Sequence, residues 1–208
     1  MLHIKELKHS YDGSAMINYP DWEVQKGNHA IILGNSGCGK TTLLHLIGGL
    51  TKPTGGYLEV AGEDLSQKSN TSLDHFRGVN IGIVFQKPHL VRSLTVKENL
   101  TLSQYLGQKK IDGSRADEVL DRLGIKELAN RKIHQISQGQ AQRVSIARAV
   151  INSPKLLLAD EPTASLDDEN CKKVIDLLKS EAEETGATLI VATHDHRVKS
   201  EFQNQLNL

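Results

Sequence analysis

The segment Gly34–Thr41, GNSGCGKT, constrains the fold more than any other part of the sequence. It fits the pattern G-x-x-x-x-G-K-[ST], in which glycines let the backbone curl so that its N–H groups point at phosphate oxygens. The apolar run His29–Leu33 before it predicts a buried strand, and Lys40–Leu50 after it predicts a helix. The positive end of that helix would face the same oxygens. The alternative is an ordinary glycine-rich turn before a helix. Because the motif stands between a predicted strand and a predicted helix, an α/β phosphate-binding fold is favoured over that alternative.

The residue types of the loop predict a nucleotide site. We expect Lys40 to bridge the β- and γ-phosphates and the Thr41 hydroxyl to ligate Mg²⁺. We expect the Cys38 side chain to point outward, so that only its backbone contributes. The residues predicted to bind nucleotide are Asn35, Ser36, Gly37, Cys38, Gly39, Lys40, Thr41 and Thr42.

Short apolar runs alternate with helical patterns along the chain, which is typical of a parallel α/β sheet. We therefore expect one domain, 1–208, with an α/β core at 1–87 and 153–208 and a mainly helical insert at 88–152. The predicted strands are Tyr57–Val60, Ile81–Phe85, Lys155–Ala159 and Ala187–Thr193, and the further predicted helices are Arg115–Leu123, Gly139–Asn152 and Asp168–Glu184.

Composition excludes some classes of protein. The 25 Lys and Arg balance the 25 Asp and Glu, so the basic excess that usually accompanies nucleic-acid binding is missing. No apolar run approaches the roughly 20 residues that span a bilayer, so we do not expect an integral membrane protein. Two cysteines far apart in sequence suit a reducing cytoplasm.

Two carboxylates follow the apolar run at 155–159. We expect Asp160, at the strand tip, to hold Mg²⁺ directly or through water, and Glu161 to orient or deprotonate an attacking water. Alone, the pair could equally be two acids at an exposed strand end. Its order after the phosphate loop favours the functional interpretation.

Four further segments fall in a recognisable order: Gln86 at the end of a predicted strand, ISQGQAQR at 136–143, ASLD at 164–167 and THD at 193–195. This series, over nearly the whole chain, resembles the nucleotide-binding subunit of ATP-binding cassette (ABC) proteins. The resemblance implies a P-loop NTPase core of ABC-ATPase type, with an antiparallel β subdomain and an inserted helical subdomain. It also implies a Mg²⁺-dependent ATPase that couples ATP hydrolysis to transport or conformational work.

The resemblance assigns roles to single residues. Tyr11 matches the aromatic residue that stacks on adenine. Gln86 matches the glutamine that senses Mg²⁺ and the γ-phosphate and faces the membrane partner, and His194 matches the switch histidine at the γ-phosphate. The residues that match contacts across a dimer with two sandwiched ATP molecules are Ser137, Gly139, Gln140 and Asp167.

The signature segment departs from the usual Leu-Ser-Gly-Gly-Gln, because Ile136 and Gln138 stand at its first and third positions. Gln138 adds bulk where the signature would meet nucleotide, but Ser137 and Gly139 are kept, so we expect ATP-driven dimerisation to survive, and the sequence leaves the effect of Gln138 on affinity and turnover open.

The stretches at 81–86 and 94–100 look like the branch of lipoprotein-releasing, macrolide-export and cell-division ATPases. This resemblance implies a homodimer on the cytoplasmic face of the inner membrane. It also implies an integral membrane subunit that docks near Gln86–Asn99, and no nucleic-acid partner. The alternative is a soluble ABC ATPase, for example one in iron–sulfur cluster assembly.

Overall fold

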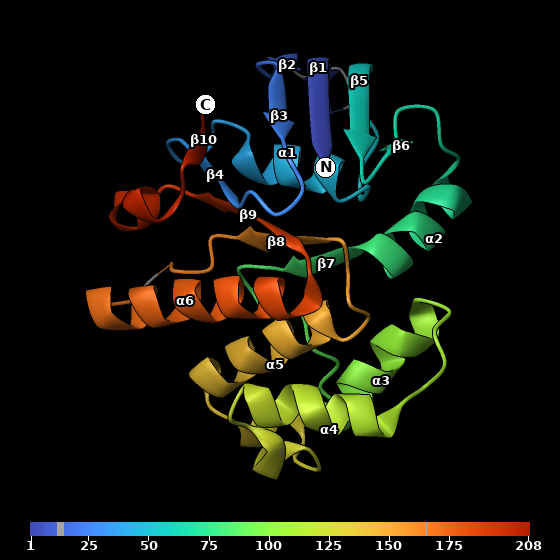
Figure 1. The fold of residues 1–208 in the computed structure, drawn as a ribbon, viewed down its shortest axis with the longest axis vertical. Helices are drawn as coiled ribbons and strands as arrows, with labels where there is room; N and C mark the ends of the chain where they lie inside the picture. The colour runs from blue at the N-terminus through green and yellow to red at the C-terminus, as the bar shows by residue number, and fades with distance from the viewer. Residues whose placement is uncertain (12–14, 165) are drawn as a thin grey trace.

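A sheet of five parallel strands lies at the centre of the protein, in the order β10-β4-β9-β8-β7 (Figure 1). We describe it from a computed structural model, which describes residues 1–11, 15–164 and 166–208. The strands are β4 (Ala30–Leu33), β7 (Ile81–Val84), β8 (Leu156–Asp160), β9 (Thr188–Thr193) and β10 (Asn204–Asn207).

Both faces of this sheet are buried. In β4, Ile31 and Leu33 belong to one apolar cluster, whereas Ala30 and Ile32 belong to another on the opposite face. Successive side chains of a strand point to opposite faces, so a strand covered on both sides needs apolar residues at successive positions. This is why the strand sequences AIIL and LLLAD contain no regular polar alternation.

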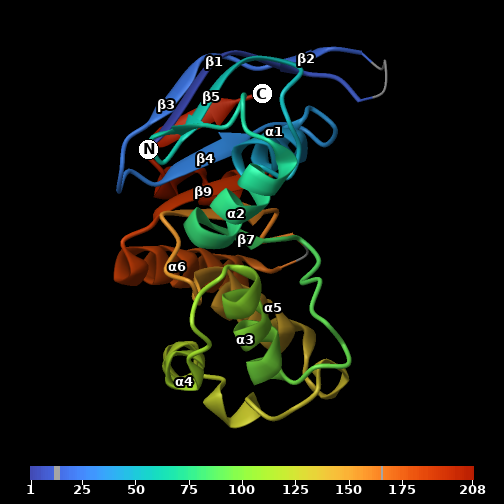
Figure 2. The ribbon, with the colours of Figure 1, turned by 90° about the vertical axis from the view of Figure 1, so that its right-hand side faces the viewer.

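A second, antiparallel sheet contains β1 (Leu2–His9), β2 (Ile17–Asn18), β3 (Trp22–Val24), β5 (Gly55–Val60) and β6 (Glu63–Asp64). Its strand β1 pairs with β2, β3 and β5. The helix α1 (Lys40–Ile47) lies between the two sheets (Figures 1 and 2). Leu43 and Leu44 of α1 join residues of both sheets in one cluster, and the expected antiparallel β subdomain is confirmed.

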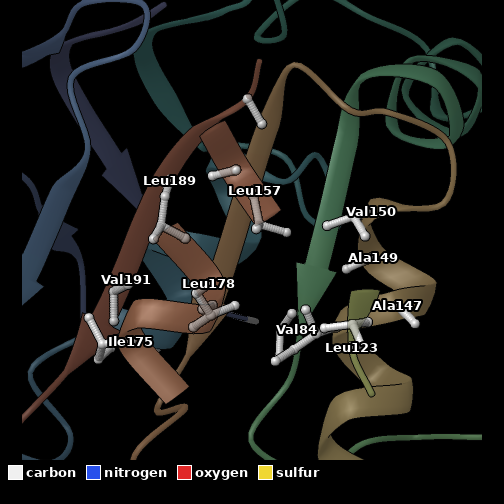
Figure 3. Close-up of a cluster of buried hydrophobic side chains, with 14 of the residues drawn as sticks. Val84, Leu123, Ala147, Ala149, Val150, Leu157, Ile175, Leu178, Leu189 and Val191 are labelled. Atoms are coloured by element: carbon white, nitrogen blue, oxygen red, sulfur yellow. The ribbon is translucent and has the colours of Figure 1, made fainter. Parts of the chain in front are cut away.

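Helices cover the other face of the parallel sheet. In Figure 3, side chains of α6 (Asp168–Thr185) and α5 (Gln138–Val150) meet those of the strands. The labelled residues are Val84, Leu123, Ala147, Ala149, Val150, Leu157, Ile175, Leu178, Leu189 and Val191. Farther from the sheet lie α3 (Val96–Leu106) and α4 (Gly113–Arg122). The remaining helices are α2 (Asn70–Asn80), η1 (Lys126–Leu128), η2 (Ile133–Gln135) and η3 (His196–Glu201).

The predicted strands and helices are present with small shifts at their ends. The helix predicted over Lys40–Leu50 ends at Ile47, because the chain turns through Gly48 and Gly49, which has a φ of 64°. The sequence analysis did not predict β1, α2 or β10. The strand β10, NQLN, buries only Leu206 and so has no apolar run to detect.

The division into 1–87, 88–152 and 153–208 stays a prediction. The helices α3 to α5 occupy 96–150, but α5 packs directly on the central sheet, where Ala149 contacts Gly82 of β7 closely. Within the described ranges, no helix is both long enough and apolar enough to cross a bilayer.

Candidate nucleotide-binding and catalytic site

Four parallel strands end at the same edge of the central sheet, and the predicted site residues follow them. Gly34 follows β4, Gln86 lies two residues past β7, Glu161 follows β8 and His194 follows β9. Ligands of open α/β sheets bind outside the carboxyl ends of the strands. A hollow of about 310 Å³ at this edge is lined by Ile17, Ser36, Gly37, Gly39, Lys40, Thr41, Thr42, Gln86, Glu161 and His194.

The loop before α1 has a backbone that glycine permits. Gly39, at the start of α1, has a φ of 102°, and no side chain caps the helix there. The Tyr19 hydroxyl donates to the Gly39 carbonyl at 3.2 Å. Burial raises the pKa of Tyr19 to about 12, so the phenol remains a neutral donor. The uncapped N–H groups of the first turn are available to an anion such as phosphate.

Lys40 is buried inside the loop. Its Nζ donates to the carbonyls of Gly34 at 2.8 Å and Asn35 at 3.0 Å. The same nitrogen lies 3.5 Å from Oε1 of Glu161. The ammonium group therefore lies at the floor of the hollow, between the phosphate loop and the end of β8.

Thr41 and Asp160 form a pair of oxygen donors. The Thr41 hydroxyl lies 3.1 Å from each carboxylate oxygen of Asp160. Burial raises the pKa of Asp160, the effect expected for a carboxylate without full charge compensation. Hard cations such as Mg²⁺ prefer oxygen ligands, so these residues fit Mg²⁺. The exposed Gln86 lines the same hollow and offers a further amide oxygen.

Glu161 is held in an unusual conformation. Its φ of 46° is left-handed, which costs a non-glycine residue about 1–2 kcal/mol. Its Oε2 accepts from the Thr193 hydroxyl at 2.9 Å and lies 2.9 Å from Nδ1 of His194. Burial alone would raise the pKa of Glu161, but the hydrogen bonds from His194 and Thr193 outweigh it and lower the pKa. The Glu161 carboxylate is therefore ionised, and its hydrogen bonds to Thr193 and His194 fix its orientation.

Other predicted residues lie outside this hollow. Ser137 caps the N-terminus of α5. Its hydroxyl accepts from the backbone N–H of Gln140, and the Gln140 side chain accepts from the backbone N–H of Ser137. A Cβ on Gly139 would meet open space. Asp167 caps the N-terminus of α6, and the hydrogen bonds that its carboxylate accepts from Asn170 lower the pKa of Asp167. Ser137, Gly139 and Asp167 are exposed and Gln140 is half-buried, and none of the four lines the hollow at the phosphate loop.

Tyr11 lies beside the phosphate loop, and Cys38 is part of it. Tyr11 is about half exposed, and its hydroxyl lies 3.4 Å from that of Thr42. The expectation that only the backbone of Cys38 contributes stays a prediction; the side chain is half-buried and does not line the hollow. Its sulfur folds back onto Gly34, where an added Cβ would lie only 2.5 Å from it, because the loop curls through a turn with a hydrogen bond from the Cys38 N–H to the Asn35 carbonyl. Ser165, within the ASLD segment, lies outside the described residues.

The sequence analysis missed three residues at the site. Thr193 is part of the THD segment, but the sequence analysis assigned it no contact. A hydroxyl at the end of a predicted strand, next to site residues, could have indicated a hydrogen bond to the site. Ile17 and Tyr19 reach the loop from the antiparallel sheet. Nothing in the local sequence indicates that contact.

The fold and the site define a class of protein. The sequence pattern of the family described as "ABC transporter" matches residues 17–164, well over half of the chain. The chain therefore belongs to the ABC transporter family, as its ATP-binding and ATP-hydrolysing subunit.

Individual relatives agree with this assignment. The chain is 41% identical to lipoprotein-releasing system ATP-binding protein LolD 1 of Rhodopseudomonas palustris, over 84% of this chain and 79% of that protein. It is 36% identical to LolD of Shewanella oneidensis, over 100% of this chain and 93% of that protein. A solved dimeric ATP-binding cassette, MJ0796 bound to ADP and phosphate after hydrolysis, superposes with a TM-score of 0.89. It is 34% identical, over 100% of this chain and 94% of its own. These relatives support the transporter interpretation and not the iron–sulfur alternative.

Proposed function

We propose that the chain hydrolyses MgATP as one half of a homodimer and drives a membrane subunit in a complex of the lipoprotein-releasing type. The observation that carries this proposal is the half-buried Glu161 carboxylate, which His194 and Thr193 hold and which lies 3.5 Å from the Lys40 ammonium. The names of the LolD relatives support the type of complex.

The phosphate loop binds the triphosphate. Lys40 and the uncapped N–H groups at the start of α1 neutralise and orient the β- and γ-phosphates. The partly exposed Tyr11 ring stacks on the adenine. The other residues of the phosphate contact are Asn35, Ser36, Gly37, Cys38, Gly39 and Thr42.

Thr41, Asp160 and Gln86 hold Mg²⁺ with oxygen ligands. When bound, Mg²⁺ neutralises charge on the phosphate oxygens. Because burial raises the pKa of Asp160, a cation beside this carboxylate favours its ionised form.

Glu161 acts as the general base. A water molecule attacks the γ-phosphorus, its proton passes to the Glu161 carboxylate, and the bond to the bridging oxygen breaks to release ADP and phosphate. An ionised carboxylate only accepts hydrogen bonds, so the ring nitrogen of His194 at 2.9 Å is the protonated one. His194 thereby aims the carboxylate.

A second copy of the chain completes each site. Ser137, Gly139 and Gln140, at the start of α5, face the γ-phosphate held by the partner copy, and Asp167 lies at the same interface. The exposure of Ser137, Gly139 and Asp167 within one chain supports this role, as does the dimeric state of the MJ0796 cassette. Such a two-fold arrangement closes when ATP binds and opens after hydrolysis.

The membrane subunit docks beside the Gln86–Asn99 segment, on the cytoplasmic face of the inner membrane. A groove of about 450 Å³ adjoins this segment and includes Phe85, the exposed Leu106 and Arg148. Arg148 donates to the carbonyls of Pro88 and His89, so the groove is tied to the chain that follows Gln86. The lining of the groove combines apolar side chains such as Leu106 with charged ones such as Arg77, so it offers the membrane subunit both kinds of contact.

The decisive variant for hydrolysis is Glu161→Gln. We expect it to lose at least 100-fold in ATPase rate while it still binds MgATP and accumulates as an ATP-bound dimer in size-exclusion chromatography. Glu169→Gln, which removes an exposed carboxylate paired with Lys173, is the matched control and should behave as wild type. Equal ATPase rates for wild type and Glu161→Gln would overturn the role of Glu161.

Docking is tested by co-purification with the membrane subunit. Leu106→Glu places a charge on the groove and should abolish co-purification while the ATPase rate of the isolated chain stays unchanged. Ile111→Glu adds the same charge at another exposed apolar residue outside the groove and should leave co-purification intact. Equal loss in both variants would argue against the groove.

A further inference from the structure

The loops after β8 and β9 are joined at a second point, beyond the pair formed by Glu161 and His194. The Thr163 hydroxyl donates to Oδ2 of Asp195 at 3.0 Å, and the Cys171 thiol lies 3.5 Å from the same oxygen. Thr163 is two residues past Glu161, and Asp195 directly follows His194. Each loop therefore carries a catalytic side chain and a structural contact to the other loop.

One guanidinium group extends this connection. Nε and Nη2 of Arg197 donate to the two carboxylate oxygens of Asp195 at 2.8 and 2.7 Å. Nη2 also donates to the Leu166 carbonyl at 3.1 Å, and Nη1 donates to Asp168 at 2.5 Å. The planar fork of arginine makes several directed bonds at once, which lysine does not. Arg197 thus bridges the loop after β9 and the start of α6.

The residues that Arg197 holds lie on either side of Asp167. Leu166 precedes it, Asp168 follows it, and Asp167 itself caps α6 through Asn170. The Arg197 hydrogen bonds hold the pKa of Asp195 well below its usual range, so the carboxylate stays ionised. The Asp167 segment is therefore attached, through the ion pair of Arg197 and Asp195, to the residue next to His194.

We propose that Arg197 is a positioning residue that couples the Glu161–His194 pair to the Asp167 segment at the dimer interface. Exposed ion pairs contribute little to stability, so the importance of Arg197 lies in placement rather than in holding the fold together. The inference rests on the proposed function, because it needs the ATP-bound dimer. A movement of His194 when phosphate leaves would shift the Asp167 segment through Arg197.

The first test is steady-state kinetics of Arg197→Ala with MgATP. We expect kcat to fall about tenfold and KM to stay within twofold, because the phosphate loop is untouched. Arg197→Lys keeps the charge without the fork and should recover less than half of the lost rate. Lys179→Ala is the control, because it removes an ion pair to Glu201 at the other end of η3, away from both loops. It should leave kcat unchanged.

The second test separates this inference from the proposed function. Glu161→Gln alone should trap an ATP-bound dimer, and failure to do so would count against the proposed function itself. If it traps the dimer, adding Arg197→Ala should lower the trapped fraction at least fivefold. An undiminished dimer together with an unchanged kcat of the single variant would overturn the role of Arg197. Circular dichroism checks folding, and Arg197→Gln replaces Arg197→Ala in both tests if the alanine variant unfolds.

Discussion

Oε2 of Glu161 lies 2.9 Å from Nδ1 of His194, although 33 positions separate the two residues in the chain. The contact exists because β8 and β9 are parallel neighbours, with Asp160 opposite Ala192. The residue after each strand therefore emerges at the same edge, and the backbone N–H of Glu161 donates to the Ala192 carbonyl at 2.8 Å. A left-handed backbone at Glu161 then turns its carboxylate toward His194.

The lowered pKa of Glu161 predicts the pH dependence of hydrolysis. A general base works when ionised, so the rate should persist below the ordinary glutamate pKa of about 4.3 and fall only as the pH drops through the lowered value. Thr193→Val removes one hydrogen bond that lowers the pKa. The acid limb of kcat/KM should then move up by about 0.5–1 pH unit, since a hydrogen bond contributes about 1 kcal/mol.

The control for this experiment is Thr188→Val, at the far end of the same strand, where the hydroxyl accepts from the Gly27 N–H instead. Its pH profile should match that of wild type. If the acid limb of kcat/KM does not move in Thr193→Val, the Thr193 hydroxyl does not lower the pKa of Glu161.

Lys40→Ala should weaken ATP binding by at least 100-fold, about 2.7 kcal/mol, because a buried ammonium group loses its charge-assisted bonds to phosphate. Isothermal titration calorimetry measures the affinity directly. Lys52→Ala, at an exposed lysine past the end of α1, should bind as wild type does. An affinity within threefold of wild type for Lys40→Ala would contradict its phosphate role.

Gln138→Gly should raise the ATPase rate and strengthen the ATP-bound dimer, because it removes bulk at the exposed start of α5. The helix itself should lose no more than about 1 kcal/mol, the cost of glycine in a helix. Gln138→Ala separates the effect of side-chain bulk from that of backbone freedom. It removes most of the side chain, but alanine, unlike glycine, favours the helix. If neither variant changes turnover, the departure from the usual signature is neutral.

Leu157→Ala should lower the free energy of unfolding by about 2–5 kcal/mol, because Leu157 is fully buried between the sheet and its covering helices. Urea denaturation of the isolated chain measures this change. Leu106→Ala, at a leucine that is 66% exposed, should change it by less than about 0.5 kcal/mol. Similar losses in the two variants would argue against the described core.

Local patterns were enough to predict much of the site. The loop Gly34–Thr41 is a continuous motif between a strand and a helix, and Asp160 and Glu161 directly follow an apolar strand, so neighbouring residues alone indicate their place. The contact of Tyr19 with Gly39 joins the antiparallel sheet to the loop, and no local pattern encodes it. The fold of the Cys38 sulfur onto Gly34 also depends on the curl of the loop in three dimensions.

The sequence by itself determined the order of strand, loop and helix, the two-sided burial of the parallel strands and the chemical types of the site residues. These follow from hydrophobic periodicity and motif spacing, which are local properties of the chain. Only the tertiary structure decided that Thr193 and His194 hold Glu161, and that Arg197 ties their loop to the segment around Asp167. The physical reason is the order of the strands in the sheet. Because β8 and β9 pair in parallel, side chains that follow the two strands meet at one edge, and their distance along the chain does not reveal this contact.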